Sequence, residues 1–343
     1  MIYSFKNDYS SIAHPLVLKH LLECQNEQND GYGMDKHTAN AKGLILDKIK
    51  NDSDIYFVTG GTQANMVVIS ALLRPHEAVI CAESGHINTH EAGAIEGQGH
   101  KCIAISTADG KLRIKDIEKV LKEHSDMHMV KPKMIYISNT TELGGFYKRD
   151  EIIELSKFAR KNNLYLYMDG ARLASALAAS DLTYEDLGKY LDVFYIGGTK
   201  NGGYIGEAIV INNDSLKPDF SYLIKHYGAL LAKGFVGAIP FEVLMEGNIY
   251  KEIGRRENEC AYHLAKGLNA LGIKILNTEI TNQLFIVLPN KILKPLYEQY
   301  PYEIWQSVDE SNTAIRLVTS FTTRPIHING LIKCINELLK AKK

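Results

Sequence analysis

The amino-acid sequence predicts an α/β protein with a mainly parallel sheet flanked by helices and a smaller α+β unit towards its carboxyl end. From residue 55 onwards, short runs of apolar, β-branched and aromatic residues alternate with longer amphipathic segments. This alternation is typical of parallel strands joined by crossover helices. After about residue 240 it gives way to a long helical stretch and further strand-like runs. The length of 343 residues also favours one large domain and a smaller one.

The expected strands of the large unit are short runs rich in apolar and β-branched residues. Runs of this length and composition suit strands that are buried on both faces of a sheet. They lie at residues 55–59, 78–81, 101–105, 134–138, 164–168, 193–196 and 208–211.

Helices are expected between these strands, where apolar residues recur at spacings of three and four. They cover residues 63–73, 114–123, 150–161 and 184–190. The segment at 150–161 has acidic residues in its first turn and basic residues in its last, which is the distribution that a helix dipole favours.

The carboxyl-terminal unit is expected to contain one long helix, two strands and a closing helix. The long helix covers residues 241–271, and the strands cover 283–288 and 314–319. The closing helix begins near His327. This mixture predicts a small α+β domain beside the large one.

Residues 1–40 show little strand or helix periodicity and many polar residues. We therefore expect this segment to be irregular and to lie across the surface, packed on the small domain or on a neighbouring subunit. The predicted organisation is an amino-terminal segment at 1–40, a large domain at 41–240 and a small domain at 241–343.

Composition and charge exclude several classes of protein. With 45% hydrophobic and 23% charged residues, the chain has the composition of an ordinary globular protein. A net charge of −1 provides no basic excess, so we expect no nucleic-acid partner. The sequence has neither a run of about 18 apolar residues nor a basic and apolar leader, so we expect no membrane span and a cytoplasmic location. The five cysteines are far apart without a CxxC pair, and we expect reduced thiols.

Two glycines separate the first expected strand from the helix that follows it, in the sequence Thr59-Gly60-Gly61-Thr62-Gln63. Glycines allow the backbone to approach an anion closely, and the free N–H groups of a first helical turn suit a phosphate. A tight turn with a threonine cap explains the same residues. The turn alone therefore leaves phosphate binding open.

An acidic residue, Asp169, ends the strand expected at 164–168. Ligands of open α/β sheets bind at the carboxyl edge of the strands, where this carboxylate would lie. Alternatively, Asp169 caps a helix or pairs with Arg172. This position alone leaves a functional role and a structural one equally open.

A lysine, Lys200, follows the strand expected at 193–196 and has a pair of glycines on each side. Most lysines are solvated surface residues. The flanking glycines, however, leave room for a bulky group, and a partly desolvated lysine has a lowered pKa. Burial would thus supply the neutral amine that a Schiff base needs.

Together, the glycine turn, Asp169 and Lys200 meet the three requirements of a pyridoxal phosphate (PLP) site. The turn would hold the phosphate, and Lys200 would form the Schiff base. Asp169 would keep the ring nitrogen protonated, so that the ring withdraws electrons. The sequence therefore predicts a PLP enzyme.

The sequence resembles the threonine aldolases, which belong to the aromatic amino acid β-eliminating lyase group of fold type I PLP enzymes. The resemblance covers nearly the whole chain, and the order and spacing of its motifs are specific in combination. The motifs are Thr62-Gln63-Ala64-Asn65, Gly85-His86, Glu91-Ala92-Gly93, Asp169-Gly170-Ala171-Arg172, Thr199-Lys200 and Ile315-Arg316-Leu317-Val318-Thr319.

This resemblance implies roles for further residues. His86 would stack on the pyridine ring and take part in catalysis, which suits a planar imidazole. Arg172 would contact the ring hydroxyl or the substrate carboxylate, and Arg316 would bind the α-carboxylate through a two-point contact. The phosphate would be held by Gly61 and Thr62, together with Thr199 of the lysine motif.

The chain departs from the family pattern at two places that face the substrate. Asn7 stands where other members have a serine ahead of an Asp-Thr pair, and Thr141 stands in place of a histidine said to touch the β-hydroxyl group. We expect Asn7 and Thr141 to contact the substrate. The resemblance therefore predicts the cofactor more firmly than the substrate.

The resemblance implies a PLP-dependent carbon–carbon lyase. It would cleave a β-hydroxy-α-amino acid, such as L-threonine or L-allo-threonine, to glycine and an aldehyde such as acetaldehyde. A β-elimination or an aminotransferase reaction stays open, because fold and cofactor do not fix which bond breaks. A nucleotide-binding α/β protein is a remote alternative, since the sequence lacks its phosphate fingerprint.

Several features of the site stay open at this level. Thr141, Glu142, His86 or a water ordered by the cofactor phosphate could accept the proton of the β-hydroxyl group. His86 and His90 beside Glu91 could ligate a metal, but they lack a third ligand, so we expect no metal. The resemblance also implies a homodimer or homotetramer in which neighbouring subunits complete each site.

Overall fold

A seven-stranded sheet forms the centre of the larger part of the molecule. The computed structural model describes residues 2–340, and its strand order is β1-β7-β6-β5-β4-β2-β3. β7 runs antiparallel to its two neighbours, whereas the other adjacent strands are parallel. The strands are β1 (Asp54–Val58), β2 (Glu77–Ala82), β3 (Cys102–Ile105), β4 (Lys131–Ser138), β5 (Tyr165–Asp169), β6 (Val193–Gly197) and β7 (Glu207–Ile211).

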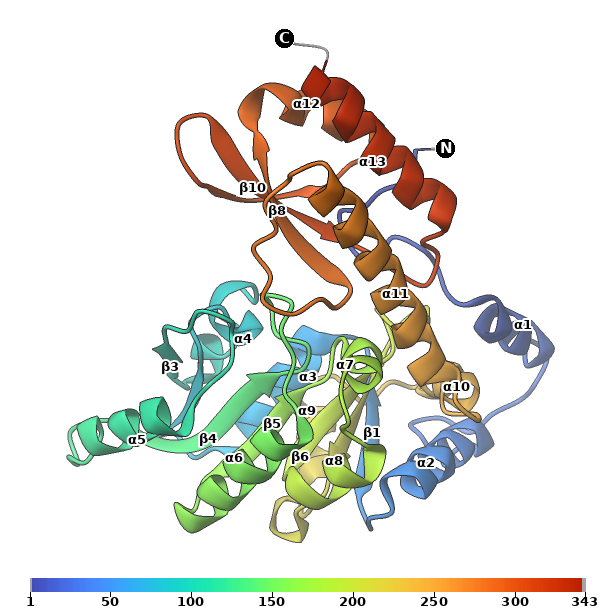
Figure 1. The fold of residues 1–343 in the computed structure, drawn as a ribbon. Helices are drawn as coiled ribbons and strands as arrows, with labels where there is room; N and C mark the ends of the chain where they lie inside the picture. The colour runs from blue at the N-terminus through green and yellow to red at the C-terminus, as the bar shows by residue number, and fades with distance from the viewer. Residues whose placement is uncertain (1, 341–343) are drawn as a thin grey trace.

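Helices cover both faces of this sheet (Figure 1), which explains why its strands are almost continuously apolar. Side chains alternate between the faces along each strand, so that one face packs on α3 (Gly61–Leu72) and α9 (Phe220–His226). The opposite face packs on the remaining helices of this layer. These are α2 (Lys36–Ile49), α5 (Ile114–Glu123), α6 (Arg149–Lys161), α7 (Leu173–Ala179), α8 (Tyr184–Tyr190) and α10 (Phe235–Leu244).

A second, antiparallel sheet lies in the carboxyl-terminal unit, with strand order β8-β10-β9. Its core also contains Phe5, whose N–H donates to the carbonyl of Pro301 at 2.8 Å. The start of the amino-terminal segment therefore packs on this small unit through Phe5. Its elements are α11 (Ile249–Ala270), β8 (Gln283–Pro289), α12 (Asn290–Gln299), β9 (Glu303–Ser307), β10 (Asn312–Val318) and α13 (Pro325–Lys340).

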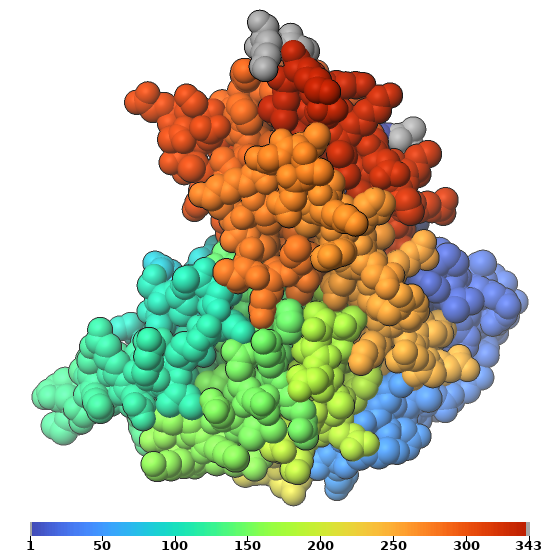
Figure 2. All heavy atoms as spheres, viewed as in Figure 1, coloured from blue at the N-terminus to red at the C-terminus, as the bar shows by residue number. Residues whose placement is uncertain are grey.

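The small unit rests on the edge of the large sheet where the site residues gather. Thr281 donates a hydrogen bond to the carbonyl of Gly144 at 2.8 Å, and Gln283 donates to the carbonyl of Thr141 at 3.2 Å. Both acceptors lie in the loop after β4. Figure 2 shows the orange atoms of the small unit seated directly on the green atoms of the large one.

The fold confirms the predicted class, an α/β protein with a mainly parallel sheet and a small antiparallel sheet. The domain boundary near residue 240 stays a prediction, and this position falls inside α10. Among residues 2–340, no helix has both the length and the apolar character that crossing a membrane requires. The short remaining helices are α4 (His86–Thr89), η1 (Glu96–Gln98) and η2 (Asp214–Leu216).

Two expectations about the helices are wrong. The single helix expected at 241–271 is two helices, because Gly247 adopts the left-handed conformation with φ +51° between α10 and α11. The segment 1–40 is not irregular throughout, since it contains α1 (Pro15–Glu23) and the start of α2. Pro15 at the first position of α1 is a helix-start signal that the apolar period alone did not reveal.

The exposed edge strand β9 was also missed. Its sequence, Glu-Ile-Trp-Gln-Ser, mixes polar and apolar residues, and only intermediate or exposed positions occur along it. An edge strand pairs on one side alone, so it needs no continuous apolar run. The signal of a buried strand is therefore absent.

Gly254 of α11 should tolerate no side chain, because a Cβ there would lie 2.0 Å from the carbonyl oxygen of Ala174 in α7. Replacing glycine by alanine in a helix normally stabilises it by about 1 kcal/mol. We expect Gly254→Ala instead to destabilise the protein by at least about 1–3 kcal/mol through overpacking. Gly43→Ala in α2 is the matched control, since its Cβ would meet nothing within 4 Å. Thermal unfolding should rank Gly43→Ala above the wild type and Gly254→Ala below it; equal midpoints for the two variants would contradict this packing.

Candidate active site

The site residues converge on the carboxyl edge of the parallel strands. Asp169 ends β5 and Gly197 ends β6, and Lys200 follows in the next loop. Because β7 is antiparallel, its first residue Glu207 lies at this same edge, paired with Gly197. Strand direction therefore places two acids and a lysine at the position where open α/β sheets bind ligands.

The Asp169 carboxylate is buried and held by hydrogen bonds from both neighbouring strands. Tyr136 of β4 donates to its Oδ2 at 2.6 Å, and Tyr195 of β6 donates to its Oδ1. The N–H of Ala171 donates to Oδ1 at 2.9 Å. Burial alone would raise the pKa of Asp169, but the hydrogen bonds of Tyr136 and Tyr195, together with the charge of His86 and the N–H of Ala171, lower this pKa below its usual value. The carboxylate is therefore ionised at neutral pH although it is only 4% exposed.

An amide connects Asp169 to His86. The Nδ2 of Asn65 in α3 donates to Asp169 at 3.2 Å and to Oε1 of Glu91 at 2.7 Å, while Tyr167 fixes the amide oxygen at 2.8 Å. The same Glu91 oxygen lies 2.8 Å from Nδ1 of His86. The buried acid Glu91 thus orients His86, the first residue of α4. The other ring nitrogen and the ring face of His86 remain for a ligand.

Lys200 lies in a tight loop that folds back on the strand ends. The N–H of Gly198 donates to the carbonyl of Gly206 at 3.0 Å, and the Asn201 side chain donates to the carbonyl of Gly197 at 2.7 Å. Burial, assisted by the positive charge of Arg172, lowers the pKa of the Lys200 amine. The neutral form required for attack on a carbonyl is thereby favoured.

Arg172 forms a buried ion pair with Asp8, which the sequence reasoning did not identify as a site residue. Its Nε and Nη2 lie 2.7 and 3.1 Å from the two carboxylate oxygens, and Asn282 donates to Asp8 at 2.9 Å. Burial would raise the pKa of Asp8, but the charges of Arg172 and Lys200 and these hydrogen bonds lower it. The available signal was that Asp8 directly follows Asn7, which stands in place of the serine ahead of the family's Asp-Thr pair.

Arg316 reaches this region from β10 of the small unit. Its Nη1 donates to Gln283 at 3.2 Å and its Nη2 pairs with Glu303 at 2.9 Å. Its Nε is buried and has no hydrogen-bond partner among the described residues. Burial, and next the charge of Arg172, lower the pKa of Arg316. Arg172 and Arg316 thus both contribute positive charge to this region.

The glycine turn places the start of α3 beside the Asp169 cluster. A Cβ on Gly61 would lie 3.0 Å from the hydroxyl of Tyr195, which itself donates to Asp169. The first N–H groups of a helix, here those of Gly61 and Thr62, have no carbonyl partner one turn earlier. A Cβ on Gly60 would meet nothing within 4 Å, so the turn has open space beside it.

These residues fit PLP. Lys200 offers an amine of lowered pKa, and Asp169 offers an ionised carboxylate for a pyridinium nitrogen. The start of α3 offers N–H groups to a phosphate. The Thr199 hydroxyl is buried beside the Glu207 carboxylate, directly before Lys200.

Two residues expected to contact the substrate are engaged elsewhere. The Thr141 hydroxyl donates to the carbonyl of Asp109 at 2.9 Å and accepts the N–H of Gly145 at 3.0 Å, and this residue is fully buried. The Asn7 side chain accepts from the N–H of Tyr9 and the hydroxyl of Ser10 within its own turn. In this conformation neither side chain has its polar oxygen free, so their role as substrate contacts stays a prediction.

Two glutamates complete the titratable groups of the site. Glu207, absent from the predicted set, accepts the N–H of Gly198 at 2.8 Å, and burial raises its pKa to about 7. Glu142 accepts the N–H of His86 at 3.0 Å and the hydroxyl of Ser138 at 2.6 Å, all through Oε1. Burial also raises the pKa of Glu142. Groups with a pKa near neutrality are suited to proton transfer.

Comparisons with known proteins agree with this geometry. Residues 22–291 match the β-eliminating lyase family. A low specificity L-threonine aldolase of Pseudomonas aeruginosa is 30% identical over 295 residues, covering 84% of this chain and 85% of the relative. The structure of Leishmania major threonine aldolase matches with a TM-score of 0.96 and 44% identity, covering 98% of this chain and 99% of that one. A serine palmitoyltransferase from S. paucimobilis, 14% identical, matches with a TM-score of 0.71 over 99% of this chain and 87% of its own.

The match to serine palmitoyltransferase shows a shared fold alone, since its identity is low. The other matches cover nearly whole chains and confirm the resemblance inferred from the motifs. They also confirm the expected enzyme class, a carbon–carbon lyase of the threonine aldolase type. The chain belongs to the β-eliminating lyase family and, within it, to the threonine aldolases.

Proposed function

We propose that this chain catalyses the retro-aldol cleavage of a β-hydroxy-α-amino acid to glycine and an aldehyde, with L-threonine or L-allo-threonine as substrate. The observation that carries the proposal is the pairing of an ionised buried acid, Asp169, with a lysine of lowered pKa, Lys200, at one sheet edge. The similarity to low-specificity L-threonine aldolases supports the choice of substrate. A cytoplasmic location is part of the proposal, supported by five cysteines that are all free thiols.

Lys200 is the attachment point for PLP in this proposal. When bound, PLP supplies an electron-withdrawing ring that accepts the electrons of the bond being cleaved. Asp169 holds a proton on the ring nitrogen, which requires that the acid stay ionised beside it. Tyr136 and Tyr195 secure that charge state, because their hydroxyls stabilise the carboxylate.

Arg316 binds the α-carboxylate of the substrate. Its buried Nε has no partner in the described chain, and Glu303, which pairs with its Nη2, has a side chain that is 40% exposed and can turn towards solvent. Arg172 adds a second positive charge, while its pairing with Asp8 fixes its orientation. Two cations near one site favour an anionic substrate group.

Glu142 accepts the proton of the β-hydroxyl group through its Oε2. Its Oε1 accepts the hydrogen bonds from His86 and Ser138, so Oε2 is the oxygen assigned to the substrate. Its raised pKa brings the carboxylate closer to the strength of an effective base at neutral pH. Thr141 is less suited to this role, since its hydroxyl already bonds the backbone. His86 is oriented by Glu91 and keeps the position expected for a stacking ring.

The deciding experiment follows product release from L-allo-threonine by the wild type, Lys200→Ala and Glu142→Gln. We expect the wild type to form acetaldehyde and glycine in equal amounts. Lys200→Ala should lose this activity together with the visible absorption band of bound PLP. Glu142→Gln should keep that band and lose about 10²–10⁴-fold in kcat, the usual contribution of a general base.

The same assay distinguishes the alternatives. If the protein formed pyruvate from serine but no aldehyde from L-allo-threonine, it would be a β-elimination enzyme and not an aldolase. Formation of glutamate from 2-oxoglutarate would indicate an aminotransferase. An unchanged absorption band in Lys200→Ala would remove Lys200 as the attachment point. Full activity of Glu142→Gln would show that Glu142 is not the catalytic base, and the role would then be assigned to His86 or to a water molecule.

We further propose a homodimer or homotetramer whose subunits share their sites. Tyr32 and Met34 are 50% and 80% exposed, and they border an apolar pocket of about 370 Å³ lined also by Tyr56 and Phe57. Exposed apolar side chains around such a pocket suit a second copy of the chain. Sedimentation equilibrium should therefore give a dimer or a larger assembly. A monomer with full aldolase activity would contradict shared sites.

A further inference from the structure

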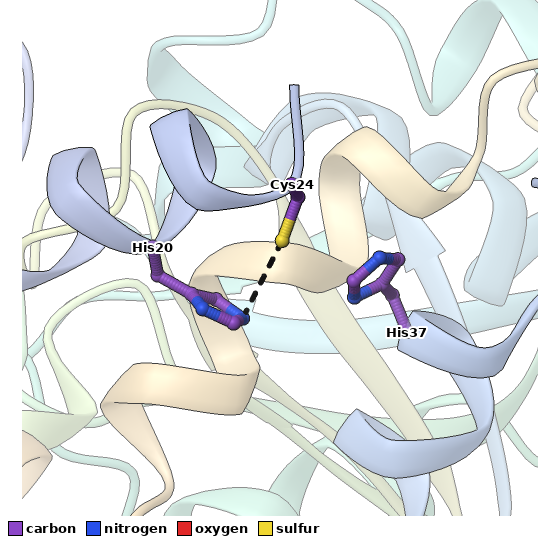
Figure 3. A group of neighbouring side chains, drawn as sticks. All are labelled: His20, Cys24 and His37. Atoms are coloured by element: carbon purple, nitrogen blue, oxygen red, sulfur yellow. Dashed lines mark hydrogen bonds between the residues drawn. The ribbon is translucent and has the colours of Figure 1, made fainter. Parts of the chain in front are cut away.

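Two histidines and a cysteine converge at a place remote in sequence from the lysine motif. His20 lies in the last turn of α1, Cys24 is the C-cap of that helix, and His37 is the second residue of α2. Figure 3 shows the three side chains pointing towards one another from these two helices. One potential ligand atom from each lies within 4.8 Å of the others, and the Cys24 sulfur is 4.0 Å from Nε2 of His20.

A carboxylate from a third helix completes the group. The Oε2 of Glu242 in α10 lies 2.9 Å from Nε2 of His20 and 2.7 Å from Nδ1 of His37. Its side chain is only 10% exposed, and that of His37 only 4%. Glu242 thus bridges the two imidazoles from a third helix, beside the group of two histidines and a cysteine. Nitrogen, sulfur and oxygen ligands in a set of four are typical of Zn²⁺.

The second nitrogen of His37 supports a ligand role. Its Nε2 lies 2.6 Å from Oε2 of Glu27, whose other oxygen pairs with Lys36 at 3.1 Å. Histidines that bind metals usually donate their remaining N–H to a carboxylate, which fixes the ring and its tautomer. Glu27 is placed to do this while Nδ1 faces the centre of the group.

A metal ion would replace hydrogen bonds in this group, because the Glu242 oxygen now lies 2.9 and 2.7 Å from the nitrogens of His20 and His37 and would have to move away from them. With Zn–N of about 2.0–2.1 Å and Zn–S of about 2.3 Å, tetrahedral ligands lie roughly 3.3–3.6 Å apart. The sulfur-to-nitrogen distance of 4.0 Å needs only a small side-chain adjustment to reach that range. Cys24 and Glu27 line one surface pocket, and His20 and Glu242 line another, so solvent reaches the group from two sides.

We propose that His20, Cys24, His37 and Glu242 form a structural binding site for a divalent transition-metal ion, with Zn²⁺ the best match. Cys24 binds as the thiolate, and its proton leaves to solvent. Four protein ligands leave no open position, so the site is structural. This proposal differs from the expectation of no metal, which considered only His86 and His90. It does not rest on the proposed aldolase activity.

The metal would fasten the amino-terminal segment to the large unit. α1 packs against α10, and the N–H of its N-cap residue His14 donates to the carbonyl of Gly202 in the Lys200 loop at 2.7 Å. The same segment carries Asp8, the partner of Arg172. Fixing α1 on α2 and α10 therefore supports two parts of the site from a distance.

The test uses Co²⁺ as a spectroscopic substitute for Zn²⁺ in the purified full chain after treatment with a chelator. We expect one Co²⁺ per chain, with the visible bands of tetrahedral Co²⁺ and a thiolate-to-metal charge-transfer band. Added Zn²⁺ should displace it and raise the thermal midpoint of unfolding. Cys24→Ser should lose the charge-transfer band, whereas Cys334→Ser, which removes a buried thiol of the small unit, should keep it.

A second variant separates metal binding from folding defects. Glu27→Gln leaves all four ligands in place, so it should weaken Co²⁺ binding by about 10–100-fold and show the same band at saturation. The proposal is overturned if the wild type gives no charge-transfer band with Co²⁺. That result is expected if hydrogen bonds alone hold the four side chains together. It is equally overturned if Cys24→Ser, shown by circular dichroism to be folded, binds Co²⁺ with the same visible absorption spectrum as the wild type.

Discussion

The hydrogen bonds that stabilise the buried Asp169 carboxylate constrain most of the sheet around it. An isolated carboxylate in an apolar interior would take up a proton, because burial penalises its charge. Here Tyr136 and Tyr195 reach Asp169 from the two adjacent strands, so β4, β5 and β6 must keep the side chains of these residues on one face. Asn65 extends the same network into α3 and, through Glu91, to His86. The hydrogen-bond network that keeps Asp169 ionised thus links three strands and two helices.

A second balance of charge operates on the opposite side of the site. Arg172 and Arg316 bring positive charge to this region, and Asp8 provides the buried acid that pairs with Arg172 at 2.7 Å. Asp8 comes from the amino-terminal segment, whose residue Phe5 is packed into the core of the small unit. The large unit, the small unit and the amino-terminal segment each contribute a charged group. Closure of the site therefore depends on all three.

Sequence reasoning recovered the parts of this arrangement that have a local signal. Continuous apolar runs indicated the buried strands. Asp169 stood out because it directly follows such a run, and Lys200 because it lies between two glycine pairs shortly after one. Asp8 had no such signal, because it precedes the first helix in a polar segment and meets Arg172 only in the folded chain. The tyrosines of β4 and β6 looked like ordinary strand residues. Their hydroxyls acquire a role only through the strand order.

The same limit applies to the amino-terminal segment. His20 and Cys24 are four residues apart on one helix, but the helix itself was not predicted, and His37 and Glu242 lie far along the chain. Thr141 illustrates the reverse case: a position inferred by family resemblance has a hydroxyl that bonds the backbone. The surroundings of Thr141 and the grouping of His20, Cys24, His37 and Glu242 both depend on contacts between distant segments. Such contacts cannot be predicted from the spacing of residues in the sequence.

The ionisation state of Asp169 is the central claim, and infrared difference spectroscopy between the wild type and Asp169→Asn measures it most directly. At neutral pH the wild-type side of the difference should contain carboxylate stretching bands and no carboxyl C=O band from this residue. These bands should persist on acidification until the pH falls below the ordinary pKa of an aspartate, because the tyrosine hydrogen bonds lower the pKa of Asp169. A protonated C=O band at neutral pH would contradict the account, since a neutral Asp169 could not hold a proton on the ring nitrogen of PLP.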